Sequence, residues 1–253
     1  MRGLVRAGLI VLSLALAFGP AAGWAPQTRI RMVDEAVRLM PASLRIALER
    51  HREPLLRGML EPMTQEDSPE HRPEWAGGSL DGAVEREAAS LVASLQEPGS
   101  FDRIARGFGR LAHYVTDAGF PPLAGGTDDE KRYADFAAFC EERRERFPLV
   151  FYGHDDAALA EGDFRAFALA LLARARDDDR ELARAYAAAG DPPDPAAFDD
   201  RSLPFAIGSL SYSRSITGIV RAWLAAWKNG GGDMGRTPYL KQPTTEDESG
   251  RAR

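Results

Sequence analysis

The chain has 253 residues, with 32 lysines and arginines against 38 aspartates and glutamates, which gives a formal net charge of -6. This acidic balance argues against general binding to the nucleic-acid backbone, because proteins of that class present a basic patch that neutralises phosphates. The single cysteine, Cys140, excludes an intramolecular disulfide and any cysteine-rich zinc site.

The N-terminal segment has the pattern of a secretory signal peptide. Two arginines precede an apolar run over residues 7–18, and small residues follow it. We expect residues 1–23 to be removed by a cut before Trp24, or alternatively before Pro26, and the mature protein to be exported, either to the periplasm or out of the cell. An uncleaved anchor is the weaker interpretation, because the run is shorter than the roughly 20 residues that span a membrane.

The remainder of the chain has the periodicity of α-helices. Apolar residues recur at every third or fourth position, and no segment alternates as a half-buried strand does. We expect one all-α domain over residues 24–228 and a flexible tail over 229–253, which lacks the apolar surface to offset chain entropy. Helices are predicted over residues 30–40, 41–57, 80–96, 101–118, 128–147, 162–189 and 203–228, with a loop over 58–78.

The segment Leu111-Ala-His-Tyr-Val-Thr-Asp117 carries the strongest chemical signal. On a helix, the four-residue spacing places His113 and Asp117 on one face, which suits two ligands of one metal ion. The same pair also stabilises a helix without any metal, and taken alone this interpretation is the more common one. The following Gly119 and Pro121 end the helix and place the pair beside a loop.

Three other histidines have weaker signals. His71 lies in the acid-rich loop after the second predicted helix, where ligands are often found. His51 lies in a charged run and is expected to be a solvated surface residue. His154 stands beside two acids in a predicted loop and is only a reserve ligand. In the last predicted helix, Trp223 and Trp227 at a four-residue spacing favour a core stripe over contact with a membrane surface.

Together these residues resemble the bacterial zinc-dependent phospholipase C family and the related single-strand-specific fungal nucleases. The resemblance rests on Trp24 near the mature N-terminus, on an acid and His71 in the loop, and on the string His-Tyr-x-x-Asp-x-x-x-Pro that begins at His113. It implies a helical fold with zinc ions in a cleft and hydrolysis of a phosphodiester, such as a phospholipid headgroup, by a zinc-activated water.

Carried over residue by residue, the resemblance implies zinc ligands at Trp24, His71, His113 and Asp117. Either Asp67 or Glu61 would supply a further acid, which could also serve as the base. Two family histidines are missing, because Thr28-Arg29 and Pro122-Leu123 stand where the pattern requires them. We therefore expect one zinc ion where the family has three.

Two functions, and a more remote third, follow from this pattern. The first is an exported, zinc-dependent phosphodiester hydrolase with a reduced metal site. The second, nearly as well supported, is a catalytically silent relative whose helical body binds a ligand or a partner protein. The third is a purely structural helical protein with an accidental resemblance. Loss of the later histidine ligands favours the second over the first, because catalysis by such sites depends on clustered metal ions.

Overall fold

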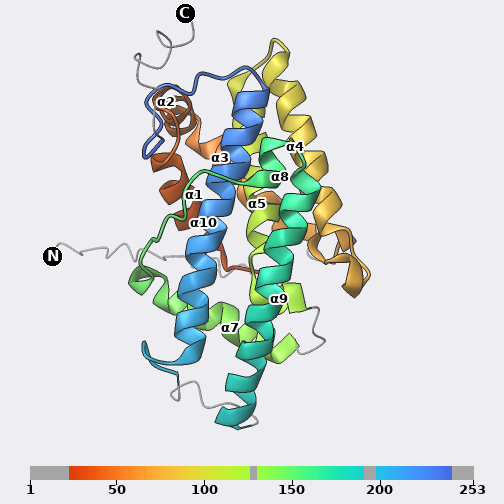
Figure 1. Ribbon diagram of the computed structural model, residues 1–253, viewed down its shortest axis with the longest axis vertical. Helices are drawn as coiled ribbons and strands as arrows, with labels where there is room; N and C mark the ends of the chain where they lie inside the picture. Colours follow the sequence, from red (N-terminus) through yellow and green to blue (C-terminus); the bar gives the residue numbers. More distant parts are fainter. Residues whose placement is uncertain (1–22, 66, 126–129, 191–197, 241–253) are drawn as a thin grey trace, which may run out of the picture.

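The structure is a computed structural model that describes residues 23–65, 67–125, 130–190 and 198–240 (Figure 1). In this part of the chain every regular element is a helix, which confirms the all-α prediction, and the helices form one domain. They are α1 (Pro26–Arg38), α2 (Ala42–Arg50), α3 (Arg52–Leu60), α4 (Leu80–Gln96), α5 (Phe101–Ala118), α6 (Pro121–Gly125), α7 (Glu130–Arg143), α8 (Ala157–Ala160), α9 (Phe164–Ala189) and α10 (Leu203–Asn229), with short 3-10 turns over Glu61–Gln65, Pro69–His71, Glu74–Ala76 and Arg144–Arg146.

The predicted helices over 80–96 and 101–118 have the observed bounds, whereas the one over 41–57 is divided in two. The division falls at His51, between α2 and α3. Pro54 explains it, because proline has no N–H to donate to the carbonyl four residues earlier and its ring clashes with that carbonyl. The predicted loop over 58–78 contains three of the 3-10 turns, and the short helices α6 and α8 were not predicted.

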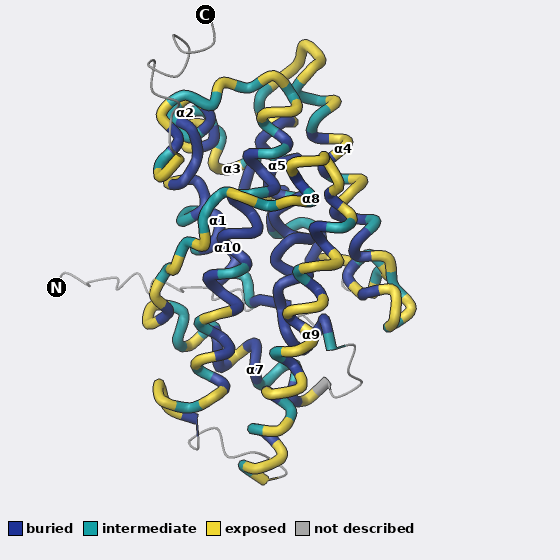
Figure 2. Tube along the Cα trace, viewed as in Figure 1, coloured by how far each residue is buried: buried dark blue, intermediate teal, exposed yellow. Residues whose placement is uncertain are grey.

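Helix α5 is the central element of the domain. It packs against α3, α4 and α10, and thirteen of its eighteen residues are buried. Its N-terminus is capped by Ser100, whose side chain accepts a hydrogen bond from the backbone N–H of Asp102. Buried residues line the inward sides of the helices in Figure 2, and α9 and α10 run side by side along the long axis in Figure 1. The last turns of α5 therefore lie in the interior.

Two glycines allow α3 and α5 to approach closely. A Cβ atom on Gly109 would lie 2.1 Å from the carbonyl oxygen of Leu55, and one on Gly58 would lie 2.1 Å from that of Arg106. Real Cβ atoms do not approach an oxygen so closely, so the two backbones can touch only where both residues lack side chains. This contact sets the distance between α5 and the segment that carries Met59.

Helix α10 covers another side of α5. Trp223 and Tyr212 are fully buried, and the indole N–H of Trp223 donates a 2.9 Å hydrogen bond to the carbonyl of Phe108 in α5. This confirms the core interpretation of Trp223 over the membrane-surface one. None of the described helices combines the length and apolar character that a membrane-spanning segment requires.

The first part of the predicted tail contacts the helical body. The indole N–H of Trp227 donates to the carbonyl of Asp233, and His154 Nε2 lies 2.7 Å from the carbonyl oxygen of Pro238. Residues 230–240 are thereby attached to α10 and to the segment before α8. The rest of the predicted tail, residues 241–253, and the predicted signal peptide up to residue 22 lie outside the described residues.

Replacing Gly109 by alanine should lower the free energy of unfolding by about 3 kcal/mol, because the new methyl group forces α3 and α5 apart. Chemical denaturation followed by circular dichroism measures the change. Gly82→Ala in α4 is the matched control, since a Cβ atom there meets no other atom within 4 Å. This control should raise stability by about 0.5 kcal/mol. Equal effects of the two substitutions would contradict the close helix contact.

Candidate functional site

The structure brings three of the predicted site residues together. His71, His113 and Asp117 form a buried cluster whose potential ligand atoms all lie within 4.8 Å of one another, so it could hold a metal ion. His113 and Asp117 stand one turn apart on the last turns of α5, as predicted, and His71 ends the 3-10 turn Pro69–His71. The side chains of all three are at most 2% exposed.

Backbone hydrogen bonds hold the loop that carries His71 against the start of α4. The N–H of Leu80 donates to the carbonyl of Arg72, and the N–H of Ser79 donates to that of Pro69, both at 2.9 Å. Within the loop, the Ser68 side chain accepts a hydrogen bond from the N–H of Glu70 and caps the 3-10 turn. His71 is therefore held in place by its own backbone as well as by its contacts with α5.

The spacing of the three ligand atoms fits a tetrahedral ion. His71 Nδ1 lies 2.8 Å from Asp117 Oδ2, His113 Nε2 lies 3.2 Å from the same oxygen, and the two nitrogens are 3.4 Å apart. Two ligands of a tetrahedral zinc ion, each bound at 2.0–2.1 Å, are separated by about 3.3 Å. The donor set of two imidazoles and one carboxylate also suits zinc.

The second nitrogens of the two imidazoles differ in their surroundings. His113 Nδ1 lies 2.7 Å from the carbonyl oxygen of Met59 and donates to it, which leaves the lone pair of Nε2 directed at the cluster. A metal-bound histidine usually has such a partner. Nε2 of His71 is buried and has no hydrogen-bond partner in the described structure. The cluster therefore fits a metal in spacing but is incompletely supported around His71.

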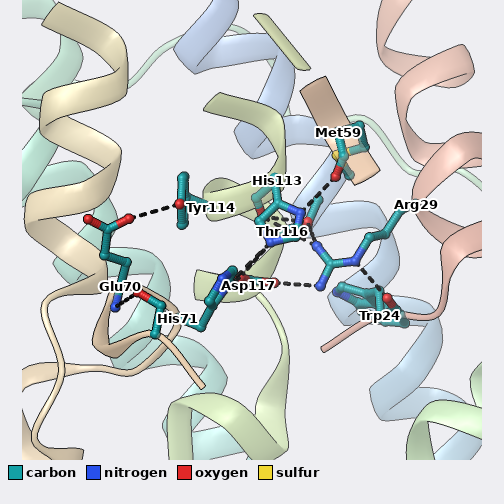
Figure 3. A network of polar contacts seen from close by, with 10 residues as sticks. Trp24, Arg29, Met59, Glu70, His71, His113, Tyr114, Thr116 and Asp117 are labelled. Atoms are coloured by element: carbon teal, nitrogen blue, oxygen red, sulfur yellow. Dashed lines mark hydrogen bonds and ion pairs between the residues drawn. The ribbon is translucent and has the colours of Figure 1, made fainter. Parts of the chain in front are cut away.

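A cation is already present in the centre. The Arg29 guanidinium from α1 donates from NH2 to Asp117 Oδ1 at 2.5 Å, and both side chains are 0% exposed. It also donates to Thr116 Oγ1 and to the carbonyl of Trp24, each at 2.6 Å. Asp117 thus lies between Arg29 on one side and the two histidines on the other (Figure 3). One carboxylate oxygen faces the guanidinium, and the other faces the imidazoles.

Charge and burial together shift the acid–base equilibria of the centre. Burial alone would raise the pKa of the Asp117 carboxyl, but the positive charge of Arg29 and the hydrogen bond from His71 hold this pKa well below its usual value of 3.8. Burial lowers the pKa of His113 from 6.5, and the positive charge of Arg29 lowers it further, while Asp117 opposes the change. At neutral pH the centre therefore contains an ionised Asp117 and a neutral His113, balanced by Arg29.

The other predicted ligands do not join the cluster. Asp67 is exposed, and Glu61 instead forms a two-pronged ion pair with Arg106. Neither of the two acids therefore lies beside the histidines. Trp24 is buried, as a ligand would be, but its carbonyl oxygen accepts the hydrogen bond from Arg29.

A further polar network borders the centre. The Tyr114 hydroxyl donates to Glu70 at 3.0 Å, and Arg86 pairs with the other oxygen of the same carboxylate at 2.6 Å. The ring of Tyr114 lies against both His71 and His113, with centroids 5.4 and 5.3 Å away. Together with the burial of Tyr114, the Glu70 carboxylate raises the pKa of this phenol, so Tyr114 stays protonated.

The role of Arg29 was missed by the sequence interpretation, which treated it only as a lost histidine. A signal for it exists in α1, where the buried residues Met32, Val33, Ala36 and Val37 follow Arg29 at helical spacing. Arg29 thus stands at the head of the apolar stripe. An arginine in such a stripe is seldom buried without a carboxylate partner, and this points to an internal ion pair.

Comparison with known proteins adds no relative, since no family model, curated protein or solved structure matches this chain.

Acidification should destabilise the protein through His113. Below pH 6.5 the unfolded chain takes up a proton on this side chain that the folded protein resists, because the folded pKa is lower. The stability present above pH 6.5 is therefore lost as the pH falls, by up to about 1.4 kcal/mol per pH unit. His113→Gln, which keeps a donor for the Met59 carbonyl, should flatten this slope between pH 6.5 and 5 in urea unfolding curves. An unchanged slope in the variant would show that His113 is not the group responsible.

Proposed function

We propose that this chain is a catalytically silent, exported helical protein whose buried polar centre stabilises the fold. The observation that carries the proposal is the ion pair between Arg29 and Asp117, which is 2.5 Å long and has no solvent exposure on either side chain. Asp117, the residue on which a zinc site would depend most, already has its charge neutralised. On this proposal, the resemblance to the zinc-dependent phospholipase C family extends to the positions of some residues but not to zinc-dependent hydrolysis.

Charge balance supports this assignment. Arg29 and Asp117 sum to zero, and His113 is neutral because burial lowers its pKa. A divalent ion bound beside them would leave a net charge of about +2 in the interior, and burying charge without a counter-ion is strongly unfavourable. The charge of the centre therefore disfavours the binding of a second cation.

Access to the centre supports it as well. Hydrolysis of a phospholipid or another phosphodiester requires the substrate to reach the metal-ligating atoms, yet these side chains are at most 2% exposed. The ring of Tyr114 packs against both histidines. No substrate reaches the ligand atoms without a rearrangement of the segments that bury them.

If the interior is structural, the biological activity of the protein lies at its surface, and binding of a ligand or a partner protein is the role we propose. Apolar side chains suited to such contacts are exposed at Val150, Tyr152 and Tyr239, and Tyr239 is 80% exposed. Phe151, which lies between the first two in the chain, contacts the ring of Tyr239. The segments that carry Phe151 and Tyr239 therefore meet at this ring contact.

The second candidate function is a zinc-dependent phosphodiester hydrolase with a single metal ion. It is favoured by one observation, the tetrahedral spacing of the ligand atoms of His71, His113 and Asp117. When bound, zinc would supply a Lewis acid and an activated water. Against this candidate stand the charge of Arg29 and the placement of Glu61 and Asp67 away from the cluster.

Hydrolysis assays separate the two functions. Purified mature protein, supplied with zinc in slight excess, should release no product above the zinc-only background from phosphatidylcholine vesicles or from bis(p-nitrophenyl) phosphate. An authentic zinc phosphodiesterase serves as the positive control, and Asp117→Asn as the matched variant. Turnover by the wild type that disappears in Asp117→Asn would show that the centre is catalytic, and the silent assignment would then be wrong.

A further inference from the structure

We infer that Arg29 acts as the built-in cation of a latent zinc site: it keeps a divalent ion out of the cluster of His71, His113 and Asp117, and removing its charge opens that cluster to zinc. The inference rests on the closed centre described under the proposed function. It concerns metal binding, however, and is tested without any assay of catalysis.

The ligand atoms are in place before any ion arrives. Their mutual separations of 2.8, 3.2 and 3.4 Å bracket the edge of a zinc tetrahedron. Asp117 Oδ2 and His113 Nε2 both direct lone pairs at the cluster. For His113 this follows because its ring proton is on Nδ1, which donates to the Met59 carbonyl. Two acceptors 3.2 Å apart are stable only with a proton or a cation between them. The His71 Nδ1–H can supply that proton, and zinc binding would release it to solvent.

Arg29 weakens zinc binding through the carboxylate that the two cations would share. Its NH2 group holds Asp117 Oδ1, while a metal ion would bind Oδ2 of the same side chain. The guanidinium withdraws negative charge from the carboxylate and repels a divalent ion across a buried, low-dielectric distance. Two ligands that compete for one charge show a coupling free energy that lowers the affinity of each.

The guanidinium cannot simply swing away to admit an ion. Nε and NH1 are fixed by hydrogen bonds to the Trp24 carbonyl and Thr116 Oγ1, and the hydroxyl of Thr116 in turn donates to the carbonyl of His113. The whole side chain is buried, so no position in water is open to it. Exclusion of the ion is therefore a fixed property of the folded protein.

Substitution of Arg29 provides the test. Arg29→Met keeps an unbranched, though shorter, side chain but removes the charge, and it leaves Asp117 as a buried carboxylate without its cation. Arg29→Lys is the matched control, because it retains the positive charge while losing hydrogen bonds. The double variant Arg29→Met/His113→Ala removes one of the three proposed ligands. Binding of Zn2+ is measured by calorimetry, and Co2+ is used as a spectroscopic probe of tetrahedral coordination.

We expect Arg29→Met to bind one Zn2+ about 100-fold more tightly than the wild type, and to show the intense visible bands of tetrahedral Co2+. Arg29→Lys and the double variant should bind no better than the wild type. Because Arg29→Met loses a buried ion pair, it can be unfolded without metal. In that case addition of zinc should restore the helical circular dichroism signal, since metal binding free energy then contributes to folding.

Three results would overturn the inference. One is tight, stoichiometric zinc binding by the wild type with Arg29 intact. Another is an Arg29→Met protein that gains no affinity, or that stays unfolded when zinc is added. The last is an equal gain in Arg29→Lys, which would make side-chain size the cause instead of charge. Failure of the proposed function is distinct, because it consists of metal-dependent turnover by the wild type.

Discussion

The buried ion pair between Arg29 and Asp117 is the interaction on which the rest of the centre depends. Neither charge has access to water, so each is tolerable only because the other is 2.5 Å away. The pair joins α1 to the last turn of α5, and through Trp24 and His71 it also ties down the N-terminal segment and the loop before α4. A polar cluster thereby acts as a junction of four segments.

The position of this junction follows from the packing of α5. Gly58 and Gly109 bring α3 against α5, and this contact places the Met59 carbonyl where His113 can donate to it. Trp223 of α10 donates to the carbonyl of Phe108 in the same helix α5. Contacts with α3 and α10 thus fix α5, and hydrogen bonds to the Met59 carbonyl and to Arg29 hold the side chains of His113 and Asp117. Such a fixed geometry suits a structural centre, and it also holds the three potential ligand atoms at metal-like spacing.

Local sequence signals were sufficient for much of the fold. The apolar periodicity and the break at Gly119 and Pro121 predict the bounds of α5, and the four-residue spacing places His113 and Asp117 on one face. The local signals could not predict the hydrogen-bond and ion-pair partners of these residues, because those partners come from segments that are distant in the sequence. Arg29 is 88 residues from Asp117, and Glu61 is drawn away by Arg106, 45 residues later. The resemblance places a family histidine at Thr28-Arg29, and it therefore gives no reason to expect an arginine paired with Asp117.

The most direct test of this account is a double-mutant cycle of unfolding free energies with Arg29→Met, Asp117→Asn and the combination of both. Each single variant leaves one buried charge without its counter-ion and should lose about 3–5 kcal/mol of stability. The combined variant buries neither charge, so its loss should not exceed that of the worse single variant, which corresponds to a coupling of about 3 kcal/mol or more. Losses that simply add in the combined variant would contradict the claim that Arg29 is the resident cation for Asp117.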